Sequence, residues 1–428
     1  VNIEVLSFMD CEFMFFHSAY EQLVPQLKAG LPKVIRFICI DRVSEHGPSL
    51  EEWIIGNSEP YRGGIEDPLA GAVLQPTGGT TGPSKAALYT HRNLEMMFLA
   101  SRECFRYSPE SISLAVAPLT HAGGMVALAN LCCGGKVVVI NLTSPAQLLD
   151  EVQRAGITHV FLPPSLLYMA LNEMRTAPRD VSSLKMLTTG SAPVAPEKIK
   201  EATRVFGPVM TEGFGLTECG MLLTWKSPDD YLTADGSFDE AALASTGRAV
   251  TIARVEIMDS EGRILPPGER GEIVAQAGTM MREYYKNPGE TEAFLRFGWG
   301  HSGDVGIKDE RGFITVVDRL KEMIVTGGFN VFPAQIEAVI LKNDAVLDCA
   351  VVGVPDDKWG EAVKAVVQLK PGRTVDPEIL IDSCRQKLGG HCAPKSVEFW
   401  EHLPRSAVGK LLRRDVRKKF WEKNWRAV

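Results

Sequence analysis

The 428-residue sequence lacks most of the features that mark membrane, secreted or metal-binding proteins. No apolar run approaches the length of about 20 residues that a membrane-spanning helix needs. The start, Val-Asn-Ile-Glu-Val, has neither the charged segment nor the cleavage site of a signal peptide. Nine cysteines are present, but they form no CxxC pair and no Cys/His spacing typical of a zinc site. We therefore expect a cytoplasmic protein with reduced thiols and no integral membrane segment.

Positive charge is also scarce, with 46 basic against 53 acidic residues and a formal net charge of -7. Proteins that bind nucleic acid along their surface neutralise its phosphates with a basic face. The composition therefore excludes nucleic-acid binding as a main activity, although it leaves room for a local basic site. Internal repeats and low-complexity segments are missing as well, so the chain is neither fibrous nor disordered.

What the sequence does contain is a globular composition, 45% hydrophobic and 23% charged, over a length that exceeds a single core. Two or more domains are therefore expected. The chain begins without a methionine, and we interpret its start as the middle of a fold. We expect a processed or partly recorded polypeptide that lacks the first part of its N-terminal domain.

Between Ala70 and about Gly215, apolar runs of strand length alternate with amphipathic segments of helix length. This alternation is typical of a mostly parallel sheet covered on both faces by helices. One helix is predicted with Ser144 as its N-cap, Pro145 in its first turn and Gly156 as its stop. The predicted strands are Ala70–Gln75, Ile112–Pro118, Lys136–Ile140, Thr158–Leu162 and Leu184–Thr188.

The pattern changes twice after this region. Short strands and Gly/Pro turns beyond Gly215, such as Val255–Asp259, predict a smaller β-rich subdomain. From about Asp318, strands such as Cys349–Val354 and helices such as Pro377–Leu388 predict a separate domain. The expected fold class is therefore α/β: a large N-terminal domain of stacked α/β subdomains with a β-rich subdomain, plus a small α+β C-terminal domain.

The segment from Gln75 to Lys85 reads Gln-Pro-Thr-Gly-Gly-Thr-Thr-Gly-Pro-Ser-Lys. Its glycines let the backbone approach an anion, its threonines offer hydroxyl donors, and Lys85 adds a positive charge. It lies between a strand-like and a helix-like segment, which predicts a ligand site at a strand-to-helix turn. The spacing differs from that of a P-loop because Pro83 and Ser84 separate Gly82 from the lysine. Judged alone, the segment is either a phosphate cradle or an ordinary surface turn.

The loop and several further segments, in this order along the chain, resemble the adenylate-forming enzymes, a superfamily that includes acyl-CoA and aryl-CoA synthetases, luciferases and nonribosomal adenylation domains. The resemblance covers essentially the whole chain. It is strongest to AMP-forming acyl-CoA synthetases of the medium-chain fatty acyl, benzoate and feruloyl type. The further segments are Pro118–His121, Thr189–Pro193, Gly213–Glu218, Trp299–Asp304, Asp318–Glu337 and Pro404–Lys410.

The resemblance implies a site for ATP and Mg²⁺. Thr217 would contact the α-phosphate, and Glu218 would hold Mg²⁺ through a carboxylate oxygen. Asp304 and Arg319 would bind the ribose hydroxyls, although the same pair is compatible with a structural ion pair. The phosphate loop would consist of Thr77, Gly78, Gly79, Thr80, Thr81, Gly82 and Lys85. The adenine would pack against Gly190, Ser191, Ala192, Gly213, Phe214 and Gly215, with Phe214 at a position where the family usually has tyrosine.

The resemblance also implies a mobile C-terminal domain, residues 322–428, that turns about a hinge at 319–321 against an N-terminal domain at 1–318. Lys321 would occupy the hinge, and Gly327 and Gly328 would line the tunnel for the pantetheine arm of coenzyme A. Lys410 would meet the carboxylate and the α-phosphate, and the expected catalytic set is Lys410, Thr217, Glu218 and Lys85. The basic tail that follows Lys410 and includes Arg413 is typical of a solvated helix face.

Three residues are expected beside the acyl group of the substrate: His121, Met125 and Met221. A lone histidine is more often structural than functional, so His121 is compatible with a structural role as well as with a role beside the substrate. The neighbours of the two methionines, Val126 and Leu222, are apolar as well and predict an apolar pocket. The sequence is compatible with a medium-chain fatty acid and with an aryl or phenylpropenoic acid.

The predicted function is an AMP-forming carboxylic acid:CoA ligase whose partners are a small carboxylic acid, ATP and coenzyme A, acting as a monomer or homodimer. No Ser/His/Asp or Cys/His arrangement is recognisable, which agrees with chemistry that needs no side-chain nucleophile. Two alternatives stay open. The enzyme would transfer its acyl group to a carrier protein, or the chain would be a non-catalytic nucleotide-binding homologue.

Overall fold

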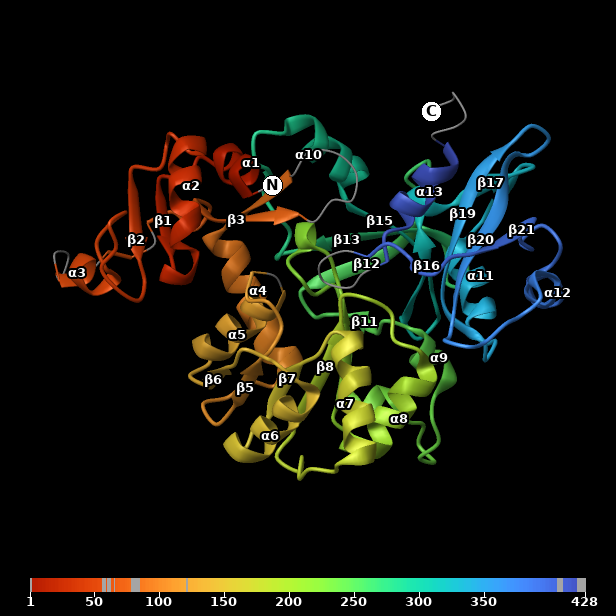
Figure 1. The fold of residues 1–428 in the computed structure, drawn as a ribbon, viewed down its shortest axis with the longest axis horizontal. Helices are drawn as coiled ribbons and strands as arrows, with labels where there is room; N and C mark the ends of the chain where they lie inside the picture. Colours follow the sequence, from red (N-terminus) through yellow and green to blue (C-terminus); the bar gives the residue numbers. More distant parts are fainter. Residues whose placement is uncertain are drawn as a thin grey trace. The chain divides into compact units, whose positions relative to one another are not determined.

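A computed structural model describes residues 2–55, 59, 63–64, 66–77, 85–120, 122–405 and 411–421 (Figure 1). The chain forms two compact units, the first made of Val1–Glu95 with Met281–Ala293 and the second of Met96–Met280 with Phe294–Val428. Within the described ranges, no helix combines the length and the apolar character that crossing a membrane requires.

The first unit contains two small sheets. Strands β1 and β2 pair in parallel, and β3, β4 and β14 form an antiparallel sheet in the order β14-β4-β3. The elements of this unit are α1 (Asn2–Phe8), β1 (Phe13–Phe16), η1 (Ser18–Leu23), α2 (Val24–Gly30), β2 (Arg36–Cys39), α3 (Leu50–Ile55), β3 (Gly71–Thr77), β4 (Lys85–Thr90), β14 (Glu283–Tyr284) and most of α10 (Pro288–Phe294).

The second unit is built on a seven-stranded sheet in the order β11-β10-β9-β8-β7-β5-β6. Strands β5 to β9 run parallel, and β10 and β11 add antiparallel partners at one edge. The strands are β5 (Ile112–Ala115), β6 (Lys136–Val139), β7 (His159–Phe161), β8 (Met186–Gly190), β9 (Met210–Phe214), β10 (Thr224–Lys226) and β11 (Arg248–Ala249). The accompanying helices are α4 (His91–Phe105), α5 (Ala122–Cys132), α6 (Pro145–Ala155), α7 (Pro164–Thr176), α8 (Pro196–Phe206) and α9 (Glu240–Ala244).

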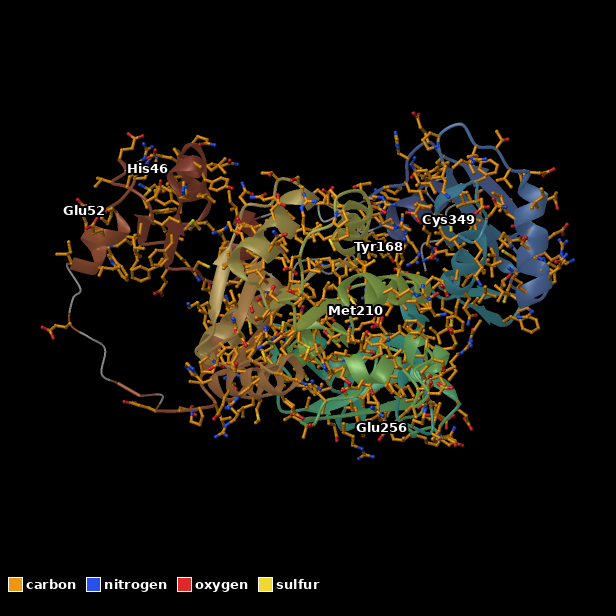
Figure 2. All side chains as sticks on the ribbon, turned by 90° about the horizontal axis from the view of Figure 1, so that it is seen from below. His46, Glu52, Tyr168, Met210, Glu256 and Cys349 are labelled. Atoms are coloured by element: carbon orange, nitrogen blue, oxygen red, sulfur yellow. The ribbon has the colours of Figure 1, made fainter. Side chains whose placement is uncertain are left out.

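Helices α6, α7 and α8 cover one face of this sheet (Figure 1), and their apolar side chains form its largest core. Leu149 on α6, Leu167 on α7 and Met210 on β9 are each at most 1% exposed in that core, and Met210 is labelled in Figure 2. A second cluster combines side chains of α4 and α5 with those of β10 and of the turn before it, among them Phe105, Val126 and Leu222. Both faces of the sheet are therefore buried, as a parallel sheet requires.

Two more sheets complete the second unit. The β-rich subdomain is an antiparallel sheet in the order β12-β13-β15-β16, and the C-terminal sheet has the order β18-β17-β20-β19 with β21 beside β20. The strands are β12 (Ala253–Met258), β13 (Arg270–Ala277), β15 (Gly300–Lys308), β16 (Ile314–Arg319), β17 (Ile324–Thr326), β18 (Phe329–Val331), β19 (Val346–Asp356), β20 (Gly360–Leu369) and β21 (Ser396–Phe399). The helices are α11 (Pro333–Ile340), α12 (Pro377–Leu388) and α13 (Arg413–Trp421), and the short 3₁₀ turns are η2 (Thr217–Cys219), η3 (Pro228–Tyr231), η4 (Arg296–Gly298) and η5 (Leu320–Glu322).

The sequence patterns predicted most of these elements. Helix α6 begins as expected, because the Ser144 hydroxyl accepts a hydrogen bond from the Gln147 amide at 3.2 Å. It ends at Gly156, whose φ of 60° lies in the left-handed region. Helix α12 has the predicted bounds, and the predicted β-rich region is confirmed by β12 and β13.

One placement was wrong. The Gly/Thr segment was expected between a strand and a helix of the parallel sheet, but Thr77 ends β3 and Lys85 begins β4, and these strands pair antiparallel in a separate sheet. Ala86 to Thr90 form a short apolar run that fits a helix or a strand equally well, and its pairing with β3 and β14 decides for the strand. The helix, α4, starts only at His91.

A buried ion pair lies under the end of strand β9. The side chain of Lys226 on β10 is fully buried, and its ammonium lies 2.8 Å from Glu212 Oε2 on β9. It also donates to the carbonyl oxygens of Ala242 at 2.9 Å and Ser245 at 2.6 Å. Burial raises the pKa of Glu212, and the neighbouring ammonium opposes this shift. The pair joins β9, β10 and the C-terminal end of α9 at one point.

We predict that Lys226→Met destabilises the protein by about 3–5 kcal/mol, because the Glu212 carboxylate stays buried without its partner. Urea unfolding followed by tryptophan fluorescence measures the loss. A matched control is Lys198→Met, which removes a lysine that is one-third exposed and paired with Glu201 on the same helix, and should cost less than about 1 kcal/mol. Equal stability of the two variants would contradict this role of the pair.

His159 is a second buried polar residue, on β7, and it is 4% exposed. Both ring nitrogens have partners: Nδ1 lies 2.7 Å from Thr158 Oγ1 and Nε2 lies 2.9 Å from the Phe105 carbonyl oxygen. Burial lowers the pKa of His159 from 6.5 to about 4, with a smaller contribution from the charge of Lys185. The imidazole is therefore neutral at pH 7.

We predict a loss of stability as the pH falls from 6.5 towards 4, since the unfolded chain binds a proton at His159 that the folded chain does not. The full effect is on the order of 3 kcal/mol. Urea unfolding at pH 7.5 and pH 5 should show a smaller acid loss for His159→Gln than for the wild type. The exposed His402→Gln serves as a control and should keep the wild-type slope. If the stability of all three proteins fell equally between pH 7.5 and pH 5, His159 would not be the cause of the acid loss.

Candidate active site

The described ends of the Gly/Thr loop lie in the first unit. Lys85 forms an ion pair with Glu290 Oε2 at 2.5 Å, and its ammonium lies 5.1 Å from the centre of the Tyr284 ring. Thr77 pairs with Lys85 across the β3–β4 ladder. The ammonium is thus held by a carboxylate that an incoming phosphate would have to replace. The predicted loop residues Gly78, Gly79, Thr80, Thr81 and Gly82 lie outside the described residues.

In the second unit, the carboxyl ends of β8 and β9 come very close together. Gly190 pairs with Gly213, and a Cβ atom added at Gly190 would lie 2.8 Å from the Gly213 carbonyl oxygen. A Cβ at Gly213 would lie 2.7 Å from Leu222 Cδ2. A side chain is therefore excluded at Gly190, and at Gly213 it would force Leu222 to move. Ser191 and Ala192 follow directly and are exposed, so the small residues that follow β8 are open to solvent.

The turn after β9 is equally constrained. A Cβ at Gly215 would lie 2.0 Å from the Met221 carbonyl oxygen, so only glycine fits there. Thr217 and Glu218 open the short turn η2, which is fixed from below because Thr279 Oγ1 donates to the Cys219 carbonyl oxygen at 2.8 Å. Both predicted phosphate and metal residues are half-buried.

Two predicted site residues have strained backbones. Ser191 has a φ of 66° and Met221 a φ of 79°, in the left-handed region that side chains other than glycine rarely adopt. Such strain persists only where the surroundings enforce it, and it gathers at functional sites. That these two residues border a ligand stays a prediction.

Asp304 and Arg319 face each other on neighbouring strands. They are register partners on β15 and β16, and Arg319 Nε lies 3.2 Å from Asp304 Oδ1. The Asp304 side chain is 10% exposed and that of Arg319 is 54% exposed. The ion pair expected as the alternative to ribose binding is therefore present. The exposed guanidinium and the adjoining carboxylate can still donate to and accept from the two hydroxyls of a ribose.

The loop before Asp304 is held by a group that sequence reasoning missed. Glu272 Oε1 accepts a hydrogen bond from the Gly303 amide at 3.0 Å, and Glu272 Oε2 lies 2.7 Å from His301 Nδ1. Ser302 Oγ accepts from the Asp304 amide at 3.0 Å. Glu272 is distant from these residues of β15 in the sequence, and only the pairing of β13 with β15 brings it close to them.

The segment around the predicted hinge is tied to the C-terminal helix. Lys321 is exposed in the turn η5, but its neighbour Glu322 accepts a hydrogen bond from Arg413 Nη1 at 2.5 Å. Arg413 Nε also donates to Glu337 Oε1 at 2.8 Å. The interpretation of Arg413 as part of a solvated tail was wrong, because it is three-quarters buried between two carboxylates. Lys410 lies outside the described residues.

Gly327 and Gly328 form the tight turn between β17 and β18, with φ values of 57° and 82°. A Cβ at Gly327 would lie 2.4 Å from the Trp359 ring, and the Gly327 amide donates to the Trp359 carbonyl oxygen at 3.0 Å. The turn therefore needs glycine both for its conformation and for its contact with the ring. Whether a pantetheine arm passes here stays a prediction.

Of the predicted acyl residues, Met221 packs against an apolar cluster. Val126 and Leu222 are buried in the cluster that α4 and α5 form with the end of the sheet, and Met221 and Phe161 pack against it. Met125 is half-buried on α5. His121, directly before that helix, lies outside the described residues.

Among the described residues, no three His, Cys, Asp or Glu side chains are close enough together to hold a metal ion. The described residues therefore form no structural zinc or calcium site. A Mg²⁺ ion needs only one or two protein carboxylates when the phosphates of a substrate supply its other ligands. That Glu218 provides such a carboxylate stays a prediction.

Comparison with known proteins agrees with this geometry. Residues 4–285 match the AMP-binding enzyme family, and residues 335–410 match the AMP-binding enzyme C-terminal domain. The prediction of a large N-terminal α/β domain followed by a small C-terminal domain is thereby confirmed. The exact boundaries at 318 and 321 stay a prediction.

Two curated relatives are each 36% identical to the chain. The medium/long-chain-fatty-acid–CoA ligase FadD8 of Mycobacterium tuberculosis aligns over 376 residues, 84% of this chain and 65% of the relative. The feruloyl-CoA synthase of an Amycolatopsis species aligns over 350 residues, 81% of this chain and 70% of the relative. The chain thus spans about two-thirds of the length of these relatives.

Among solved structures, the crystal structure of ATP-bound MatB from Rhodopseudomonas palustris superposes with a TM-score of 0.87 at 25% identity, covering 99% of this chain and 82% of that one. The shared fold includes both the nucleotide-binding part and the C-terminal part. With both domain types matched in order along the sequence, this protein belongs to the AMP-binding family of adenylate-forming enzymes.

Proposed function

We propose that the protein is an AMP-forming carboxylic acid:CoA ligase that activates a fatty or aryl acid with MgATP. The observation that carries the proposal is the side-chain-free junction of Gly190 and Gly213, followed directly by the turn that holds Thr217 and Glu218. A flat surface for adenine, a hydroxyl for the α-phosphate and a carboxylate for a metal stand next to one another along the chain.

The nucleotide would be bound by groups of different kinds. The adenine packs on the open surface formed by Gly190, Ser191 and Ala192, and the ribose hydroxyls bind Asp304 and Arg319. Thr217 donates to the α-phosphate. Mg²⁺, when bound at Glu218, offsets charge on the phosphate oxygens. The Gly/Thr loop from Thr77 to Lys85 holds the β- and γ-phosphates.

In the first half-reaction, a carboxylate oxygen of the substrate attacks the α-phosphorus, the bond to the bridging oxygen breaks, and pyrophosphate leaves. Two anions must approach each other, which requires a positive group already in place. Lys410 supplies this charge in the proposed closed arrangement, and Lys85 moves from Glu290 to the departing phosphates. The product is an acyl-adenylate.

In the second half-reaction, the thiol sulfur of coenzyme A attacks the acyl carbon and AMP leaves with the former carboxylate oxygen. The C-terminal domain would turn about Lys321, which removes Lys410 and brings the turn at Gly327 and Gly328 towards the acyl group. Two arrangements are needed because the groups used for adenylation and those used for thioester formation cannot surround the same carbonyl at once.

The names of the relatives support coenzyme A as the acceptor, since both are described as CoA-ester-forming enzymes. They leave the acid open, because one name refers to fatty acids and the other to a phenylpropenoic acid. Transfer to a carrier protein and a non-catalytic homologue are the competing hypotheses, and both make different predictions in the same assay.

We predict that the protein releases pyrophosphate from MgATP in the presence of a suitable fatty or aryl acid, and that adding coenzyme A yields the thioester. Coupled pyrophosphate detection and chromatography of the CoA ester measure the two steps. Pyrophosphate without any thioester would favour a carrier-protein acceptor. Silence over a broad panel of acids, together with ATP binding in calorimetry, would favour the non-catalytic homologue.

We further predict that Lys410→Ala slows adenylation by about 10²–10³-fold, because one preorganised positive group at the reacting anions is lost. Thioester formation from supplied acyl-adenylate should fall much less, since Lys410 is remote in that step. Single-turnover kinetics of each half-reaction test this. Lys387→Ala, which removes an exposed lysine on α12, is the control and should leave both rates unchanged. Equal losses in both half-reactions would contradict the domain rotation.

A further inference from the structure

Strand β15 bulges at the residue predicted to bind the ribose. The register between β13 and β15 shifts between Glu272 and Val274, so that one residue of β13 faces three residues of β15, Ser302 to Asp304. Gly303, in the middle of this bulge, has a φ of 71° in the left-handed region. Bulges bend a strand and re-aim its side chains, and they are frequent beside active sites. The bulge therefore sets the direction of the Asp304 side chain.

Backbone groups of the bulge are bound by two side chains. Glu272 Oε1 accepts a hydrogen bond from the Gly303 amide at 3.0 Å. Ser302 Oγ accepts from the Asp304 amide at 3.0 Å and donates to the Ile273 carbonyl oxygen at 2.6 Å. Backbone groups that leave a regular ladder need such partners when they are buried. The amide of Asp304 and the amide directly before it are thus held by side chains.

Glu272 is itself fixed in place. Its side chain is 13% exposed, and Oε2 lies 2.7 Å from Nδ1 of His301, whose side chain is 5% exposed. The other ring nitrogen of His301, Nε2, lies 3.1 Å from the Arg296 carbonyl oxygen. The Arg296 guanidinium lies 3.8 Å from the Glu272 carboxylate. Because each carboxylate oxygen has its own partner, the side chain has little freedom to rotate.

The bulge connects this carboxylate to the predicted ribose site. Asp304 directly follows Gly303 and faces Arg319 on β16, with Arg319 Nε 3.2 Å from Asp304 Oδ1. The strands β13, β15 and β16 are neighbours in one sheet, so the ribose pair and its support belong to the same rigid element. Binding side chains keep a productive geometry only when a second layer of contacts fixes them.

We infer that Glu272 is a positioning residue for nucleotide recognition: by binding the Gly303 amide, it holds the bulge in the conformation that presents Asp304 to the ribose hydroxyls. A carboxylate is costly to bury in a sheet, and an apolar side chain would fill its place more cheaply if packing were its only role. Loss of the carboxylate should therefore weaken selection for the ribose hydroxyls more than binding of the rest of the nucleotide. This inference rests on the nucleotide site of the proposed function.

The test compares AMP with 2′,3′-dideoxy-AMP, which differ only by the two ribose hydroxyls, in calorimetric binding that needs neither a carboxylic acid nor turnover. The wild type should bind AMP about tenfold or more tightly, since hydrogen bonds to charged side chains are lost in the analogue. Glu272→Ala should reduce this preference several-fold by weakening AMP, and should leave the affinity for the analogue nearly unchanged. In an Asp304→Ala background it should have little further effect, because Glu272 acts through Asp304.

Two further variants separate the hydrogen bond from the mere presence of the side chain. Glu272→Gln keeps an oxygen that can accept from the Gly303 amide, so it should retain most of the preference for AMP. Ser302→Ala removes the other side chain that binds the bulge, and it should reduce the preference in the same direction as Glu272→Ala. An equal loss in Glu272→Gln and Glu272→Ala would contradict a role through the Gly303 amide.

The matched control is Glu256→Ala. Glu256, labelled in Figure 2, is a carboxylate of the same sheet with a similar side-chain exposure of 16%, and it lies 2.8 Å from Lys308, the last residue of β15. It makes a comparable ion pair away from the bulge. Its removal should lower the melting temperature but keep the wild-type preference for AMP.

The two proposals fail in different ways. If the wild type binds AMP and the analogue equally, or if Glu272→Ala and Ser302→Ala lower the melting temperature at an unchanged preference, the carboxylate only stabilises the sheet and the inference is overturned. If neither nucleotide binds, the nucleotide site is wrong and both proposals fall. If Glu272→Ala loses the preference but no acid supports pyrophosphate release, the inference stands and the ligase function is wrong.

Discussion

The close approach of β8 and β9 is the constraint on which the candidate site depends. A Cβ at Gly190 would meet the Gly213 carbonyl oxygen, and a Cβ at the next glycine, Gly215, would meet the Met221 carbonyl oxygen. The backbone itself therefore forms the surface, and the chain must leave the sheet in a tight turn. Thr217 and Glu218 stand in that turn. Neighbouring residues have strained φ angles for the same reason.

The interactions beneath this junction make its geometry stable. Directly before Gly213, Glu212 is bound to the fully buried Lys226 on the next strand, which also donates to carbonyl oxygens in α9 and directly after it. On the other side of the turn, Thr279 ties η2 to the segment that follows β13. Buried polar networks of this kind contribute little net stability, but they specify one arrangement when every member has a partner. The junction of β8 and β9 is thus supported by the buried ion pair of Glu212 and Lys226.

How much of this the sequence predicts depends on the range of the interactions. Helix α6 follows from Ser144, Pro145 and Gly156, because caps act over a few residues. The strand at Lys85 was missed, since a short apolar run becomes a strand only through partners distant in the chain. Arg413 was taken for a solvated residue because its carboxylate partners lie far away in the sequence. The buried hydroxyls of Tyr107 and Ser113, which have no hydrogen-bond partner among the described residues, result from packing, which one sequence does not contain.

The ion pairs of Arg413 with Glu322 and Glu337 also limit how the C-terminal part of the chain can move. Arg413 joins Glu322, next to Lys321, to Glu337 on α11, and it opens α13. Three pieces of backbone that are separate in the sequence are thus pinned to one guanidinium. In a rotation at 319–321 these three pieces would move together as one body. Local melting of α13 would leave the buried carboxylate of Glu337 and the partly exposed carboxylate of Glu322 without their shared counter-charge.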